Sequence, residues 1–103
     1  MATLISLTVR DGALFFGLGA EDMTDAEFRV REEIYVDRAG AELAAEFPGV
    51  EVELEYDRRV DGRLCHYAET SGGGLSCSED ERIGDRIRDA LGRAFVAACE
   101  VSL

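Results

Sequence analysis

The residue types that could carry chemistry gather in one stretch, ETSGGGLSCSEDE, from Glu69 to Glu81. Its glycines and Cys77 could form a backbone cradle for an anion or an activated thiol at the start of a helix. The spacing matches neither G-x-x-x-x-G-K-[ST] nor G-x-G-x-x-G, and the chain contains no lysine to hold a phosphate. Three consecutive acids would also repel a nucleotide. We therefore interpret the stretch as a connection into a helix whose capping box is Ser78 and Glu81.

The rest of the sequence gives little support to a catalytic cysteine. His66 is the only histidine, and the chain has no asparagine or glutamine that could form an oxyanion hole. The cysteines are widely spaced and odd in number, which favours free thiols and lacks the paired spacing of a zinc site; they are Cys65, Cys77 and Cys99. We expect no metal, no cofactor and no enzymatic activity. An alternative enzyme or small-ligand site would depend on Cys77, His66 and the Gly72–Gly74 loop.

Two Asp-Gly pairs stand between alternating apolar runs, which is the pattern of a β-hairpin turn. The first pair, Asp11-Gly12, would join residues 3–9 to residues 14–18, and the second, Asp61-Gly62, would join residues 50–60 to residues 64–69. Closing the first turn gathers six apolar residues on one face of the sheet; these are Ile5, Leu7, Val9, Leu14, Phe16 and Leu18. Closing the second places Asp57 opposite His66.

One helix is predicted after each hairpin. Thr24 and Glu27 make a capping-box pattern ahead of a helix from Asp25 to Phe47. Apolar residues also alternate between positions 28 and 36, which leaves open a strand there and the order βββαββα. The second helix follows Ser78 and carries an apolar stripe, with Cys99 expected in the core.

These elements predict an α+β fold of order ββα-ββα, in which a four-stranded antiparallel sheet carries both helices on one face. The 103 residues suffice for one domain, 1–103, whose halves 1–49 and 50–103 would share one core. The sequence contains neither an apolar run of membrane-spanning length nor a signal-peptide pattern, so we expect a cytoplasmic protein.

The net charge of −11 is concentrated in residues 21–57, which hold thirteen acids and three arginines. Such a charge opposes direct binding to nucleic acid or to anionic membranes and favours a basic protein surface. The sheet face away from the predicted helices carries a row of acids spaced about 6.6–6.8 Å apart, with an exposed aromatic residue beside it. The predicted partner-binding residues are Glu51, Glu53, Glu55, Asp57, Phe15 and His66.

Our hypothesis is a small non-catalytic module that docks on a basic surface of another protein, such as a nucleic-acid-binding groove, and inhibits or regulates it. Rows of carboxylates can occupy arginine and lysine sites that otherwise hold phosphates. In size, acidity and lack of a catalytic signature, the chain resembles the small inhibitors that phages use against host nucleic-acid machinery, anti-CRISPR proteins included. This resemblance is one of character and involves no motif. A homo-oligomer, such as a dimer whose outer sheet faces pair, is a further alternative.

Overall fold

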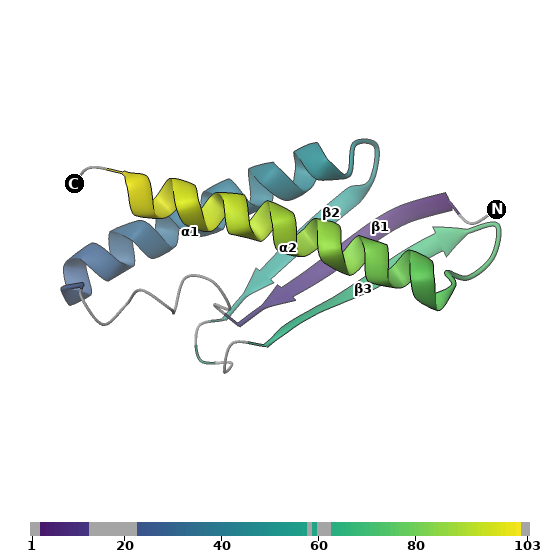
Figure 1. Ribbon diagram of the computed structural model, residues 1–103, viewed down its shortest axis with the longest axis horizontal. Helices are drawn as coiled ribbons and strands as arrows, with labels where there is room; N and C mark the ends of the chain where they lie inside the picture. Colours follow the sequence, from purple (N-terminus) through teal and green to yellow (C-terminus); the bar gives the residue numbers. More distant parts are fainter. Residues whose placement is uncertain (1–2, 13–22, 58, 60–62, 102–103) are drawn as a thin grey trace.

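The chain folds in the order βαββα (Figure 1). The computed structural model describes residues 3–12, 23–57, 59 and 63–101. Its elements are strand β1 (Thr3–Asp11), helix α1 (Asp25–Glu46), strands β2 (Glu51–Tyr56) and β3 (Leu64–Ser71), and helix α2 (Cys77–Glu100). The three strands form one mixed sheet in the order β2-β1-β3. The α+β class is confirmed, whereas the four-stranded antiparallel sheet is wrong.

The central position of β1 explains that error. β1 pairs in parallel with β2 and antiparallel with β3, so Val9 lies beside Leu54 on one side and beside His66 on the other. Both edges of β1 are therefore occupied by β2 and β3. Residues 14–18, which were predicted to pair with β1, and the second turn, Asp61-Gly62, lie outside the described residues. β2 and β3 are separated by β1, so the predicted pair of Asp57 and His66 does not form.

Asp11 is a buried strand residue and not the turn residue that the sequence predicts. It is 2% exposed at the end of β1, and its carboxylate accepts a hydrogen bond of 2.5 Å from the Tyr35 hydroxyl. Backbone bonds extend the pairing beyond it: Gly12 N–H donates to the Arg63 carbonyl at 2.8 Å, and Asp57 N–H donates to the Asp11 carbonyl at 3.0 Å. The Asp-Gly pair thus continues the sheet at the point where a hairpin would reverse the chain.

α1 is one continuous helix, so the alternative strand at residues 28–36 and the order βββαββα are wrong. The Thr24 hydroxyl caps its first turn by accepting a hydrogen bond of 3.2 Å from Glu27 N–H. After the helix ends, Gly49 takes a positive φ of 79°, which glycine adopts without steric cost. This segment follows the 3.6-residue period of a helix and not the two-residue alternation of a strand, because the side of α1 that bears Tyr35, Ala39 and Leu43 is buried.

A capping box is present at the start of the second helix, as predicted, but it begins two residues earlier than Ser78. Ser76 and Glu79 exchange side-chain to backbone hydrogen bonds of 3.2 Å in each direction. Cys77 is therefore the first residue of α2.

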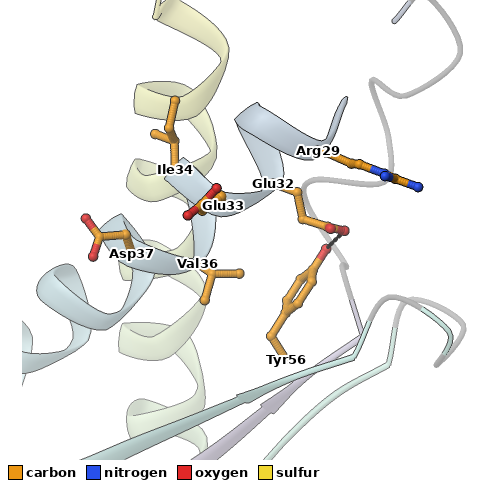
Figure 2. A pocket seen from close by; sticks show the side chains of 7 residues that line it. All are labelled: Arg29, Glu32, Glu33, Ile34, Val36, Asp37 and Tyr56. Carbon is orange, nitrogen blue, oxygen red and sulfur yellow. Dashed lines mark hydrogen bonds between the residues drawn. The ribbon is translucent and has the colours of Figure 1, made fainter. Parts of the chain in front are cut away.

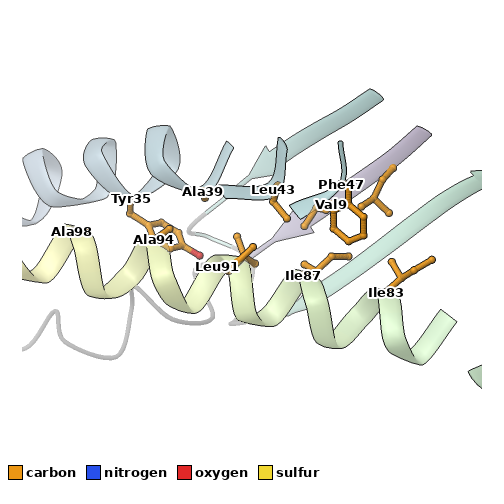
Figure 3. Packing of buried hydrophobic residues seen from close by; sticks show 12 residues of the cluster. Val9, Tyr35, Ala39, Leu43, Phe47, Ile83, Ile87, Leu91, Ala94 and Ala98 are labelled. Carbon is orange, nitrogen blue, oxygen red and sulfur yellow. The ribbon is translucent and has the colours of Figure 1, made fainter. Parts of the chain in front are cut away.

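Both helices pack on one face of the sheet, where Leu7 and Val9 meet apolar residues of α1 and α2 (Figure 3). The fully buried side chains include Tyr35, Leu43, Ile87 and Leu91. A register shift between Leu4 and Ser6 changes the pattern at the start of β1. Leu4 consequently packs against the core while Ile5, predicted inside, is 46% exposed. Cys99 was also expected in the core and is exposed.

The two helices run antiparallel, and the start of α1 and the end of α2 extend together beyond the sheet (Figure 1). Neither helix has a basic residue in its own last turn. Instead, Arg31 of α1 donates to the carbonyls of Ala98 and Cys99 in α2, at 2.7 and 3.1 Å. Arg86 of α2 in turn donates to the Glu46 carbonyl at the end of α1. Each helix therefore supplies a cation to the negative end of the other helix dipole.

Candidate protein-binding face

The sheet face opposite the helices is formed by polar side chains of all three strands. The pairing aligns them in rows across the sheet, because Ser6, Thr8 and Arg10 each stand between one residue of β2 and one of β3. The rows are Glu51–Ser6–Glu69, Glu53–Thr8–Tyr67 and Glu55–Arg10–Cys65. No described helix packs against this face, and every β2 and β3 residue of these rows is exposed.

Three carboxylates of β2 project from this face, and we call Glu51, Glu53 and Glu55 the acidic row. The intervening residues Val52 and Leu54 are half-buried and pack against the core. Strand alternation therefore places the acids as predicted. Glu55 accepts a bond of 2.9 Å from Arg10, whose side chain is 69% exposed. Glu51 and Glu53 have no ion-pair partner among the described residues.

Tyr67 is the prominent apolar group of the face, with 74% of the residue exposed. It lies in the middle row, two strands from Glu53. Closing the second hairpin with Asp57 opposite His66 would instead place Tyr67 opposite Tyr56, on the core side. The signal that could have located it was the alternation within residues 64–69, where Leu64 and Ala68 face the core and Tyr67 therefore faces away.

Asp57 and Phe15, two of the predicted partner-binding residues, do not contribute to the face as the structure describes it. Asp57 follows the end of β2, and its carboxylate is held by the Arg59 guanidinium at 3.1 and 3.2 Å. These hydrogen bonds lower the pKa of Asp57 below its usual value. Phe15 lies outside the described residues.

His66 is turned toward the helices and away from the outer face, which corrects its predicted place there. Its Nε2 lies 2.8 Å from the Asp80 carboxylate, and its side chain is only 17% exposed. The imidazole lies over Gly84 of α2, where a Cβ atom would be in van der Waals contact with the ring at 3.4 Å. His66 thus fastens β3 to the first turns of α2.

The glycine stretch connects β3 to α2 and holds two residues in conformations that favour glycine. Gly72 and Gly73 have φ values of 84° and 125°, and the Thr70 hydroxyl donates to the Gly73 carbonyl at 2.6 Å. Cys77 is exposed, while His66 is engaged by Asp80. In the described ranges, no three metal-ligating side chains gather, and no helix is long and apolar enough to cross a membrane.

A polar cluster that sequence reasoning missed lies between α1 and the ends of the two parallel strands. Tyr35 and Tyr56 meet edge to face with ring centres 5.9 Å apart. Tyr56 donates to the Glu32 carboxylate at 2.8 Å (Figure 2). Burial, followed by the hydrogen bond to Asp11, raises the pKa of the Tyr35 hydroxyl far above its ordinary value. The cluster joins α1 to the sheet and presents no pair of nucleophile and base. The sequence pattern places Asp11 in a turn and therefore does not predict its contact with Tyr35.

No family model, curated protein or solved structure matches this chain. Its function is therefore inferred from its own residues.

Proposed function

We propose that this protein is a non-catalytic binding module that docks through its outer sheet face on a basic surface of another protein and inhibits or regulates that protein. A nucleic-acid-binding groove is the kind of surface that fits. The supporting observation is the acidic row, an evenly spaced set of carboxylates on a face that no described helix covers. Two of its members, Glu51 and Glu53, have no cation beside them among the described residues.

Charge and shape both support this kind of partner. Arginine side chains that normally bind phosphates at regular intervals can instead bind carboxylates at similar intervals, by donating charge-assisted hydrogen bonds to them. Tyr67 adds an amphipathic ring on β3, at the other side of the same face, and tyrosine is enriched where protein interfaces carry most of their binding energy. The acidic row would supply charge complementarity and Tyr67 would supply burial.

The two other candidate functions have weaker support. An enzyme or ligand site would need Cys77 and His66 to act together, whereas His66 is bound to Asp80 on the helix side of the sheet. A dimer through two outer faces would bring acidic rows toward each other, and like charges in direct opposition are destabilising.

Charge reversal of Glu51 and Glu53 tests the proposal. The variant Glu51→Arg/Glu53→Arg should lose partner capture from a host lysate, because each lost charge-assisted contact would cost about 1–3 kcal/mol of binding. Unfolding in urea should be nearly unchanged, within about 0.5 kcal/mol, since both side chains are exposed. Capture by the parent protein should weaken as salt is added.

The matched control is Asp85→Arg/Asp89→Arg, which makes the same change in charge on exposed positions of α2. This control should capture the partner as the parent does. Equal capture by both double variants would contradict the proposal, because the acidic row would then be only a solvated surface. Equal loss in both would attribute binding to net charge and would also contradict it.

A further inference from the structure

β2 forms one edge of the sheet, and this edge offers a second set of binding groups beside the acidic row. Among the described residues β2 pairs only with β1. In the part of the chain that the structure describes, its outward edge presents backbone N–H and C=O groups of the kind that can pair with a further strand. The strand has six residues, EVELEY, with no proline and no lysine to oppose such pairing.

The side chains of β2 differ on the two sides of this edge. Glu51, Glu53 and Glu55 stand on the outer side, and the half-buried Val52 and Leu54 stand on the helix side. At the end of the strand, α1 and Tyr56 border an open hollow of about 640 Å³ (Figure 2). Its lining combines Ile34 and Val36 with charged side chains of α1, which are Arg29, Glu32, Glu33 and Asp37. A strand laid along the edge would therefore have the acidic row beside one set of its alternate side chains, and Val52 and Leu54 beside the other.

From these features we infer that β2 takes up an extended segment of a partner protein in which arginine or lysine alternates with apolar residues. The segment adds as a fourth strand to the sheet. Its cations lie beside the acidic row, because side chains of adjacent strands on one face are about 4.5–5.5 Å apart at Cβ. Its apolar residues lie toward Val52 and Leu54. This inference rests on the proposed function and adds the form of the partner to it.

A second copy of this chain is a poorer occupant of the same edge. Two β2 strands side by side would bring their acidic rows together on one face, which is unfavourable. The opposite edge of the sheet, β3, is less suited to a basic segment. Its outward face carries Glu69, whose carboxylate already accepts a bond of 3.0 Å from Ser6, and its helix side is closed by the contact of His66 with Asp80.

The test uses the whole protein and capped eight-residue peptides as probes. One peptide alternates arginine with valine, and a second has the same composition with its four arginines in one block. Two further peptides alternate arginine with valine but carry N-methyl groups on one or the other alternate set of backbone amides. Binding is measured by fluorescence anisotropy at low salt, and the amide protons of β2 are followed by NMR.

The alternating peptide should bind, and the block peptide should bind at least about tenfold more weakly, which corresponds to about 1.4 kcal/mol. Methylation of one amide set should abolish binding and methylation of the other should not, because only alternate amides of an added strand face its neighbour. Hydrogen exchange of β2 amides should slow in the complex. Glu51→Arg/Glu53→Arg should not bind the peptide, whereas Asp85→Arg/Asp89→Arg should.

Equal binding by both methylated peptides would overturn strand addition, since side chains alone would then make the contact. Loss of that binding in Glu51→Arg/Glu53→Arg would still leave the proposed function standing. Failure of every peptide to bind would likewise overturn the inference, while lysate capture tests the proposed function separately. Sedimentation that shows a dimer whose formation protects the β2 amides would overturn it in favour of a second copy.

Discussion

The hydroxyl of Tyr35 donates a buried hydrogen bond that should contribute to the stability of the folded protein. Both Tyr35 and the Asp11 carboxylate that it contacts are shielded from water, with 0% and 2% exposed. A buried carboxylate is costly unless hydrogen bonds compensate for the lost hydration. The Tyr35 donor therefore stabilises the end of β1 against α1.

Replacing Tyr35 by phenylalanine should lower the free energy of unfolding by about 1–3 kcal/mol, because the substitution removes a donor to a buried charged group and leaves the ring in place. Urea unfolding at pH 7 measures the loss. The matched control is Tyr67→Phe, which removes the hydroxyl of a residue that is 74% exposed and should change stability by less than about 0.5 kcal/mol.

The pH dependence of the free energy of unfolding gives a second test of the Tyr35→Phe substitution. The pKa of Tyr35 is raised in the folded protein, so its contribution is fully present below pH about 10, where tyrosine ionises in the unfolded chain. Above that pH the unfolded state loses a proton that the folded state keeps, which costs about 1.4 kcal/mol of stability per pH unit. The difference in free energy of unfolding between the parent and Tyr35→Phe should therefore decrease above pH about 10. A constant difference would contradict the assigned burial of the hydroxyl.

Among the contacts between elements, the hydrogen bonds from arginines of each helix to carbonyls at the end of the other helix should contribute measurably to stability. Arg31 is mostly buried, with 11% of its side chain exposed, and it donates to two carbonyls at the end of α2. Arg31→Met keeps much of the aliphatic stem and removes these donors, so we expect a loss of about 1–2 kcal/mol in urea unfolding.

Arg88→Met serves as the control for that measurement, because Arg88 is exposed on α2 and has no ion-pair partner among the described residues. It should change stability by less than about 0.5 kcal/mol. If both substitutions cost the same, the contacts of Arg31 with the Ala98 and Cys99 carbonyls contribute nothing beyond ordinary surface charge.

The elements themselves could be predicted from local patterns, whereas their arrangement could not. The capping pattern of Thr24 and Glu27 located α1, and the alternation of acids with Val52 and Leu54 located β2 and its exposed face. The strand order depends on pairing between β1 and residues more than forty positions away, for which an Asp-Gly pair is only a local signal. The same limitation placed His66 beside Asp57, although α2 supplies its actual partner, Asp80.

At the scale of the whole molecule, the net charge of −11 spreads over a body of 48 × 24 × 17 Å. Like charges on so small a protein repel one another in the folded state, and salt screens that repulsion. The screening length falls from about 30 Å at 0.01 M salt, comparable with the molecule's width, to about 8 Å at 0.15 M. Screening of the surface ion pairs acts in the opposite direction, but exposed pairs contribute only about 0–1 kcal/mol each.

We therefore expect the melting temperature to rise between 0.01 and 0.15 M sodium chloride, as measured by differential scanning calorimetry. Glu51→Gln/Glu53→Gln removes two negative charges that have no ion-pair partner among the described residues, and it should reduce this rise. Arg88→Gln makes the protein more negative and should increase it. A melting temperature that falls with salt would contradict the expectation, because the ion pairs between α1 and α2, such as Arg93 with Glu42 at 3.0 Å, would then outweigh the repulsion.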